Sequence, residues 1–296
     1  MGAAWKILVF GETGQVAREL RAQAPVTALG RGRADLADPA ACADAIMRTD
    51  AAAVINAAAY TAVDRAEAEE DLAMAINGVA PAAMARACAA RGLPFVHIST
   101  DYVFDGTGSA PWRPEDATGP LGAYGRTKLA GEEGVREAGG RHAILRTSWV
   151  FSAHGSNFVK TMLRLSETRD SLDIVADQVG GPTAASDIAS ACLTLAHGLA
   201  SGQGSGQGSG QGRGGTYHFA GAPDVSWADF AREIFAQAGR AVTVRDIPAA
   251  QFPTKARRPA NSRLDCTTLQ QDFGIPRPEW RQSLAATLET LKMAPS

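Results

Sequence analysis

Short apolar runs alternate with longer helical patterns along the first half of the chain. Apolar runs of this length, ended by glycine or polar residues, are typical of strands buried on both faces of a parallel sheet. This alternation predicts a doubly wound α/β fold with a Rossmann-like sheet, whose functional edge lies at the carboxyl ends of the strands. The predicted strands are residues 7–10, 26–29, 54–56, 95–99 and 143–146, and the predicted helices are residues 15–23, most of 64–90 and the segment that begins at Tyr124.

After residue 150 the pattern becomes less regular and predicts a smaller C-terminal lobe. We expect residues 1–150 to be mainly a dinucleotide-binding domain and residues 151–296 mainly a substrate lobe, with the two interleaved. Nine of the 18 residues in the segment 198–215 are glycine, so this segment is expected to be a flexible insertion that buries no core. The later predicted elements are helices at 157–167, 187–197, 226–237 and 280–291, a strand at 216–219 and an ordered loop at 253–263.

Composition and charge exclude several classes of protein. The 296 residues carry a formal net charge of −2, so no basic excess supports nucleic-acid binding. From the first residues of the sequence we expect no charged leader with a cleavage site, and no apolar run is expected to approach a membrane span. The four cysteines form no Cys-x-x-Cys, which argues against a metal site or disulfides and fits a reducing cytoplasm. These cysteines are Cys42, Cys88, Cys192 and Cys266.

Tyr124 and Lys128 are the most informative pair in the chain. Their spacing of four places both side chains on one face of the predicted helix. A phenol beside a fixed ammonium is expected to have a lowered pKa and to act as a proton donor. A reductase needs such a donor, because the substrate oxygen takes up a proton as hydride reaches the carbon. The alternative is an exposed helical pair without a role.

The segment after the first predicted strand has the composition of a dinucleotide-binding turn. Glycines let the backbone approach a pyrophosphate, and the start of the following helix supplies N–H groups. Ala17 stands where a third glycine would usually permit close packing of helix on strand. The predicted cofactor contacts in this segment are Gly11, Thr13, Gly14, Gln15 and Val16.

Two arginines follow the second predicted strand, in the region that meets the adenosine ribose of a nicotinamide cofactor. Arg31 and Arg33 stand where an acidic residue would bind the ribose hydroxyls, which favours the 2′-phosphate of NADPH, with NADH possible. The alternative is that both are solvated surface charges. Asp35 and Leu36 are expected to border the adenine. Ala57, Ala58 and Ala59, after the third strand, leave room for the cofactor, although alanine-rich packing would give the same pattern.

A run of polar residues follows the fourth predicted strand, at the expected functional edge. Thr100, Asp101 and Tyr102 belong to this run. Polar groups placed directly after a buried strand favour a functional site, and a capped turn is the alternative.

The chain resembles the extended short-chain dehydrogenase/reductases and, within them, the dTDP-4-dehydrorhamnose reductase family. The first turn and Tyr-x-x-x-Lys are shared across the superfamily, whereas the later segments are more specific to this family. The resemblance runs through nearly the whole chain. Its residues are 11–17, 56–64, 99–106, 124–132, 146–151, 157–162, 177–183 and 258–264.

The resemblance implies a role for each candidate residue and a substrate, dTDP-4-dehydro-L-rhamnose. Tyr124 would protonate the C4 oxygen, Thr100 would hydrogen-bond the same oxygen, and Lys128 would hold the nicotinamide ribose and favour tyrosinate character. Asp101, Tyr102 and Trp149 would contact the sugar, with Trp149 as an apolar wall. The loops expected to hold the dTDP part contain Gln178, Pro182 and Thr183, and Arg258, Asn261 and Arg263.

The sequence departs from the family at a magnesium site that joins two subunits in some members. Glu19 is the one acidic residue at a matching position, while Ser186 and Thr290 stand near the other two. No metal is therefore expected, and the chain is expected to be a monomer or a weak homodimer.

Two rival functions stay open. The first is another nucleotide-sugar epimerase or dehydratase, although dehydratases carry an acidic pair beside the catalytic threonine and Thr100 is followed by Asp101 and Tyr102. The second is a non-catalytic, cofactor-binding regulatory subunit of the methionine adenosyltransferase type, which resembles the same family. The presence of Thr100, Tyr124 and Lys128 together favours the enzyme.

Overall fold

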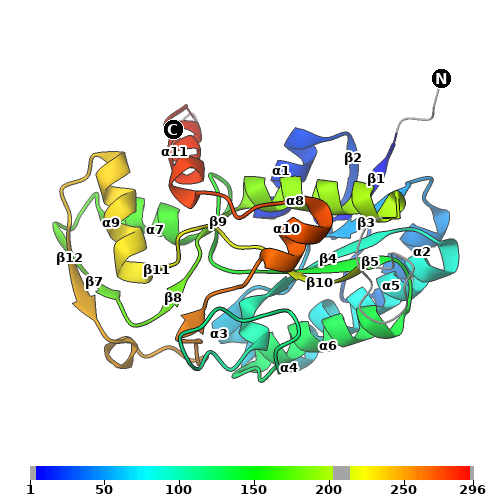
Figure 1. The fold of residues 1–296 in the computed structure, drawn as a ribbon, viewed down its shortest axis with the longest axis horizontal. Helices are drawn as coiled ribbons and strands as arrows, with labels where there is room; N and C mark the ends of the chain where they lie inside the picture. The colour runs from blue at the N-terminus through cyan, green and yellow to red at the C-terminus, as the bar shows by residue number, and fades with distance from the viewer. Residues whose placement is uncertain (1–4, 203–213, 294–296) are drawn as a thin grey trace.

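A parallel sheet of six strands forms the centre of the molecule in a computed structural model that describes residues 5–202 and 214–293 (Figure 1). The strand order is β10-β5-β4-β3-β1-β2, and every neighbouring pair is parallel. The order reverses direction beside β1, which places a switch point between β1 and β3, where ligands bind in open α/β sheets. The strands are β1 (Ile7–Phe10), β2 (Val26–Leu29), β3 (Ala53–Asn56), β4 (Phe95–Thr100), β5 (His142–Thr147) and β10 (Gly214–His218).

Helices cover both faces of this sheet because its strands are apolar on both sides. Ile7 and Val9 pack into the core on one face, and Leu8 and Phe10 pack into the core on the other. The first face is covered by α1 (Gln15–Gln23), α8 (Ala185–Ala200) and α10 (Thr267–Phe273), and the second by α2 (Pro39–Arg48), α5 (Ala80–Arg91) and α6 (Ala123–Glu137). Short segments α3 (Val63–Ala66), α4 (Glu70–Met74) and the π-helical η1 (Ala75–Val79) lead into α5.

A second, smaller lobe lies beside the sheet and has its own core, in which Phe230 of α9 and Trp280 of α11 are buried. Its helices are α7 (Phe158–Leu165), α9 (Trp227–Ala238) and α11 (Trp280–Met293). β7 (Ser171–Val175) pairs with β12 (Thr243–Ile247), and β6 (Val150–Phe151) pairs with β9 (Thr183–Ala184). β8 (Val179–Gly180) lies between β11 (Val225–Ser226) and β13 (Asn261–Ser262), and short helical turns η2 (Asp101–Val103) and η3 (Ala249–Gln251) complete the elements.

The fold class expected from the sequence is confirmed, including the parallel sheet and the smaller lobe. The sequence did not predict α2, α10 or the β7–β12 pair. The division at residue 150 stays a prediction, and β10 and α8, both beyond that residue, belong to the sheet and its cover.

The extent predicted for the glycine-rich insertion was wrong at both ends. Residues 198–200 are the last turn of α8, and residues 214–215 are the first residues of β10. Leu199 is fully buried, so its apolar contacts outweigh the poor helix propensity of the neighbouring glycine. Residues 203–213 lie outside the described part of the chain.

The expectation that no apolar run approaches a membrane span was too strong. The helical run Glu70–Arg91 is long and apolar enough to pass such a test by length and composition. Most of its apolar window, 61%, is buried inside the protein, where Met84 and Cys88 of α5 pack in the core between the sheet and its helices. Since core helices pass the same test, this run is weak evidence for a membrane span.

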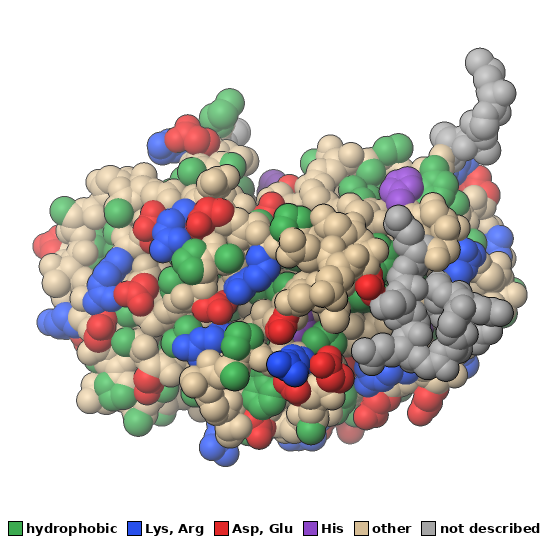
Figure 2. All heavy atoms as spheres, in the orientation of Figure 1, with side chains coloured by type: hydrophobic (Ala, Val, Ile, Leu, Met, Phe, Trp, Pro, Cys, Tyr) green, Lys and Arg blue, Asp and Glu red, His purple; other side chains and the backbone are tan. Residues whose placement is uncertain are grey.

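The surface facing the viewer in Figure 2 mixes acidic and basic side chains. Surface ion pairs include Arg232 with Asp246 and Arg245 with Asp173.

Candidate active site

A cavity of about 1010 Å³ opens at the carboxyl ends of the strands. Its walls come from the turns that follow β1, β2, β3, β4 and β5 and from the first turns of α6. This is the edge that the strand order predicts for a ligand. The predicted residues that line it are Gly11, Thr13, Gly14, Gln15, Val16, Arg31, Asp35, Leu36, Ala57, Ala58, Ala59, Thr100, Asp101, Tyr102, Tyr124, Lys128 and Trp149.

The turn after β1 has the backbone conformation that lets the protein main chain approach a ligand closely. Gly11 has a φ of +112°, a conformation that side chains rarely adopt, and a Cβ there would lie 3.3 Å from the carbonyl oxygen of Ala57. Gly14 is the N-cap residue of α1, so the first N–H groups of that helix lie at the cavity.

The two arginines predicted for the adenosine end behave differently. Arg31 lines the cavity, whereas the guanidinium of Arg33 donates to the carbonyl oxygen of Ala28 and is not part of the lining. Glu12 also lines the cavity and was not predicted from the sequence. Its carboxylate lies so close to Gly30 that a Cβ at Gly30 would be 2.2 Å from Glu12 Oε2. Glu12 belongs to the predicted turn, and its acidic character was the available signal.

Tyr124 is half-buried beside Tyr102, with their rings edge to face and 5.4 Å between centroids. Burial raises the pKa of the Tyr124 phenol well above its usual range, the charge of Asp101 adds to this, and a hydrogen bond with Thr100 opposes it. The expectation of a lowered pKa was therefore wrong for the protein alone. The physical reason is the burial of the phenol, while Lys128 Nζ donates to the carbonyl oxygen of Ile98.

Lys128 lies under Tyr124 on α6 and is almost completely buried. Its Nζ donates to the carbonyl oxygen of Ile98 at 2.7 Å and lies 3.3 Å from Nε2 of His97. Burial lowers the pKa of Lys128 to about 8, and the nearby Glu132 carboxylate opposes the shift.

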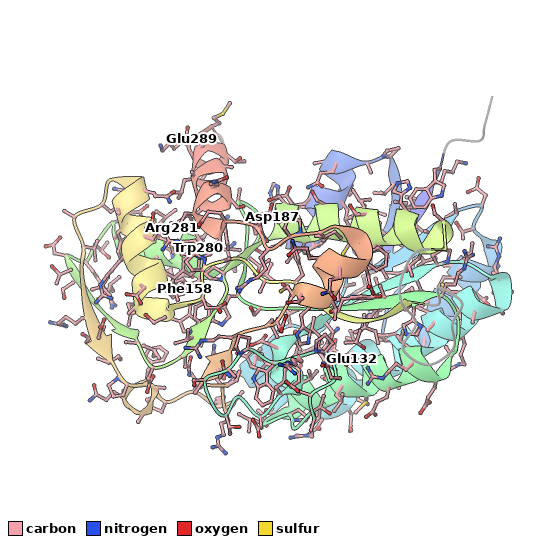
Figure 3. The ribbon with its side chains drawn as sticks, viewed as in Figure 1. Glu132, Phe158, Asp187, Trp280, Arg281 and Glu289 are labelled. Carbon is pink, nitrogen blue, oxygen red and sulfur yellow. The ribbon has the colours of Figure 1, made fainter. Side chains whose placement is uncertain are left out.

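Glu132, one helical turn after Lys128, anchors α6 to the sheet (Figure 3). It is fully buried and accepts two hydrogen bonds from Arg146 of β5, at 2.9 and 2.7 Å, and one from the Ser99 hydroxyl at 2.6 Å. Arg136 adds a bond at 3.2 Å. These partners hold the pKa of Glu132 below its usual range despite its burial. The spacing of four from Lys128 was the only sequence signal for this role.

Asp101 is a buried carboxyl at the end of β4. Its Oδ1 accepts from Thr100 Oγ1 at 3.1 Å, and burial raises its pKa to about 6, opposed by hydrogen bonds with Ser262 and Thr100. Burial and the charge of Asp101 together raise the pKa of Tyr102 to about 12.

Trp149 is held in a strained conformation at the junction of the two lobes. It is the one non-glycine residue with positive φ, +50°, in the described part of the chain. Its indole stacks on Trp227 of α9 with 3.5 Å between centroids and 10° between planes. The stack fixes the face that Trp149 presents to the cavity.

The predicted residues of the C-terminal loops do not line the cavity, namely Gln178, Pro182, Thr183, Arg258, Asn261 and Arg263. Thr183 is fully buried and its hydroxyl donates to the carbonyl of Gly181. Asn261 donates to the carbonyls of Thr107 and Ala110, and its Oδ1 accepts from Arg263. Arg258 Nη2 binds Asp64 of α3 at 3.0 Å, and its Nε is buried without a hydrogen-bond partner. Substrate contacts by these residues stay predictions.

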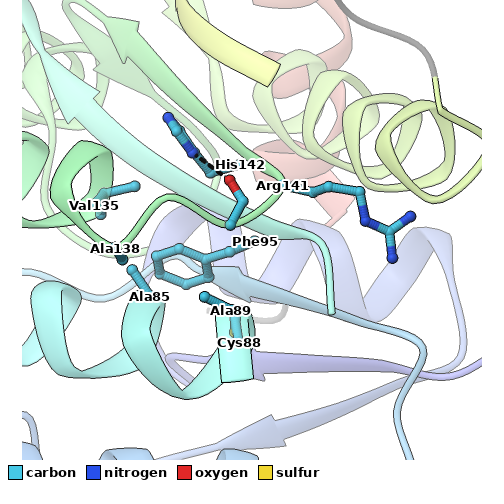
Figure 4. Close-up of a pocket in the computed structure, with 9 residues that line it drawn as sticks. Ala85, Cys88, Ala89, Phe95, Val135, Ala138, Arg141 and His142 are labelled. Atoms are coloured by element: carbon cyan, nitrogen blue, oxygen red, sulfur yellow. Dashed lines mark hydrogen bonds between the residues drawn. The ribbon is translucent and has the colours of Figure 1, made fainter. Parts of the chain in front are cut away.

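Another hollow lies near the amino-terminal ends of β4 and β5 (Figure 4). It has no room for a water molecule, with about 0 Å³ of free volume. The His142 Nδ1 contact with the carbonyl of Gly140, at 2.8 Å, closes one side of it. It is a packing gap far from the residues with chemical function.

No group of three or more His, Cys, Asp or Glu side chains suited to a metal occurs among residues 5–202 and 214–293. Glu19, considered from the sequence as a metal ligand, accepts from Ser152 Oγ at 3.5 Å and lies 3.8 Å from Nε2 of His154.

A family model and the sequence relatives of this chain indicate the same protein family. The family model described as "RmlD substrate binding domain" matches residues 5–293. The dTDP-4-dehydrorhamnose reductase of Sinorhizobium fredii is 46% identical over 286 residues, with 94% of this chain and 95% of the relative covered, and that of Salmonella typhimurium is 39% identical over 93% and 94%.

Solved structures agree with the sequence relatives. A dTDP-4-dehydrorhamnose reductase from Clostridium acetobutylicum superposes with a TM-score of 0.88 at 36% identity, covering 97% of this chain and 100% of that one. The enzyme from Bacillus anthracis, solved in complex with NADP, also gives 0.88, at 30% identity over 97% and 99%. The fold, the lined cavity and these matches together establish that the chain belongs to the dTDP-4-dehydrorhamnose reductase family.

Proposed function

We propose that this protein reduces the C4 ketone of dTDP-4-dehydro-β-L-rhamnose to the alcohol of dTDP-L-rhamnose, with NADPH as reductant and Tyr124 as proton donor. The observation that carries the proposal is the meeting of Thr100, Tyr124 and Lys128 in one cavity with the glycine turn of β1. The names of the relatives, which are reductases of this substrate, support it.

The residues present fit a nicotinamide dinucleotide. Positive φ at Gly11 and the open N-terminus of α1 suit a pyrophosphate, and the small side chains Ala57 and Ala58 leave the cavity open. Arg31 would meet a 2′-phosphate, and the NADP complex of the Bacillus anthracis relative supports NADPH. When bound, this cofactor supplies the hydride that reduces the carbonyl carbon.

The protein's own part in the reaction is to move and stabilise one proton. The raised pKa keeps the Tyr124 phenol protonated at neutral pH, so that it begins the reaction as a donor. Lys128, when protonated, stabilises the phenolate that remains after the transfer. Thr100 lies beside the phenol and is placed to hydrogen-bond the same substrate oxygen.

The sugar is proposed to contact Asp101, Tyr102 and the fixed face of Trp149, which gives it one polar and one apolar wall. The dTDP part would extend toward the loops that contain Gln178 and Arg258. The proposed division of labour is that residues 1–150 mainly hold the cofactor and residues 151–296 mainly hold the substrate. The expected cellular location remains the cytoplasm.

The test is oxidation of NADPH by the purified protein with enzymatically prepared dTDP-4-dehydro-L-rhamnose, followed by chromatography of the product. We expect dTDP-L-rhamnose in amounts equal to the NADPH consumed. A change in the sugar without loss of NADPH would indicate an epimerase or dehydratase. An intact cofactor and sugar, under conditions where a related reductase works, would favour the non-catalytic regulatory subunit.

A further inference from the structure

His97 is a buried imidazole that connects Asn56, the last residue of β3, with Lys128. It is fully buried on β4, behind the cavity wall. Its Nδ1 lies 3.2 Å from Nδ2 of Asn56, and its Nε2 lies 3.3 Å from Nζ of Lys128. Asn56 and His97 are not among the cavity-lining residues, so any effect on the site must pass through residues that they contact.

The backbone N–H of Ala58 fixes the direction of these hydrogen bonds. It donates to Oδ1 of Asn56 at 3.1 Å, and only the amide oxygen can accept that bond. The NH₂ group of Asn56 therefore faces His97. Because this group can only donate, Nδ1 of His97 must accept, and a neutral imidazole then carries its proton on Nε2. Burial and the charge of Lys128 hold the pKa of His97 well below its usual range, which agrees with a neutral ring.

The Nε2–H of His97 consequently points at Nζ of Lys128. An ammonium has three donors and no acceptor, so this N–H opposes the charged form and favours the lone pair of the neutral amine. Two other titratable groups lie near Lys128: the Tyr124 phenol in the same cavity, which is neutral, and Glu132, whose charge favours the charged form of Lys128. Glu132 is already bound by Arg146, Arg136 and Ser99, so its effect is partly neutralised.

We propose that Asn56 and His97 are positioning residues that favour the neutral form of Lys128 relative to its ammonium, so that its charge is lost on the alkaline side of neutral pH. The proposal rests on the reductase function above. Lys128 must be protonated to stabilise the Tyr124 phenolate, so reduction should decline as pH rises through the pKa of Lys128. The lowering of that pKa to about 8 by burial acts in the same direction.

The hydrogen-bonded chain from Asn56 through His97 to Lys128 is called the relay here. Asn56→Asp reverses the direction of its hydrogen bonds with little change in side-chain shape. One carboxylate oxygen can still accept from the N–H of Ala58, and the other accepts from Nδ1–H of His97, which moves the ring proton away from Nε2. Nε2 then accepts from the Lys128 ammonium. We expect the alkaline limb of the pH profile of kcat/KM to move upward by about one pH unit or more.

Making Asn56→Asp in a second variant, His97→Phe, separates the effect of the hydrogen-bonded chain from the effect of the new negative charge alone. His97→Phe keeps a ring beside Phe95 and removes both ring nitrogens. In that background Asn56→Asp should move the alkaline limb less than half as far, because only the through-space charge remains. An equal movement in both backgrounds would overturn the proposal.

Nitrogen NMR of the whole protein labelled with [¹⁵N]histidine tests the tautomer without substrate. The chain has five histidines, and the His97 signals are assigned by their loss in His97→Phe. We expect a protonated Nε2 and an unprotonated Nδ1, reversed in Asn56→Asp. A proton on Nδ1 in the parent protein would refute the proposal. If the reversal is seen but the dTDP-sugar is not reduced, the proposed function fails while the relay stands.

Discussion

At the scale of one residue, the buried charge of Asp101 lowers the free energy of unfolding at neutral pH. The folded state raises the pKa of this carboxyl from 3.8 to about 6, so it binds the proton more tightly than the unfolded chain does. Its favourable contribution is complete below about pH 4 and is lost as the pH rises through 6. At pH 7.5 the buried charge therefore costs stability, by an amount on the order of 1–3 kcal/mol.

Asp101→Asn should accordingly raise the free energy of unfolding by about 1–3 kcal/mol at pH 7.5. The gain should shrink as the pH is lowered toward 5. Urea denaturation at the two pH values measures both quantities. Asp170→Asn, a change at an exposed carboxylate, is the matched control and should stay within about 0.5 kcal/mol. A variant that is less stable than the parent at pH 7.5 would show that the charged form is well satisfied.

Arg31 and Arg33 illustrate what sequence position leaves open. Both follow β2, but only Arg31 lines the cavity, because the Arg33 guanidinium donates to Ala28. Arg31→Ala should raise KM for NADPH by about 10-fold, as expected for a lost charge-assisted bond of about 1.5 kcal/mol, and change KM for NADH little. Arg33→Ala is the matched control. Equal effects of the two variants on both cofactors would make the arginines plain surface charges.

At the scale of elements, the position of α6 depends on the buried ion pair of Glu132 with Arg146. Glu132→Gln should destabilise the fold by about 3–5 kcal/mol, because Arg146 is left as an uncompensated buried charge. Glu70→Gln removes a partner of the half-exposed Arg126 and should cost about 1 kcal/mol or less. Urea unfolding at neutral pH compares the two. Similar costs for both would show that burial of Glu132 adds nothing.

The strands that consist of an apolar run were predictable, while those that depend on a distant partner strand were not. The runs at residues 7–10 and 95–99 predicted β1 and β4 because parallel strands are buried on both faces. β7 and β12 were missed because each is half-exposed and gains its strand character from the other, 72 residues apart at Asp173 and Arg245. The roles of His97 and Glu132 depend on contacts between elements, which spacing along the chain does not show.

At the scale of the whole molecule, we predict that assembly does not depend on a divalent ion. Ser186 and Thr290 stand near the positions where the family resemblance leads us to expect metal-binding glutamates, and the Thr290 hydroxyl already donates to the carbonyl of Ala286. Hydroxyls are weak ligands for magnesium compared with carboxylates. Light scattering in magnesium and in EDTA should give the same mass, that of a monomer or weak homodimer. A dimer that dissociates in EDTA would contradict this.

The central claim, hydride addition at C4 with proton transfer from Tyr124, is tested most directly by following deuterium from [4,4-²H₂]NADPH into the sugar. The parent protein should place one deuterium on C4 of dTDP-L-rhamnose for each cofactor oxidised. Tyr124→Phe should still bind NADPH but slow this transfer by about 10²–10⁴-fold, whereas Tyr217→Phe, whose hydroxyl binds Asp272 away from the cavity, should behave as the parent. Deuterium absent from C4, or transfer by Tyr124→Phe within about threefold of the parent rate, would contradict the account.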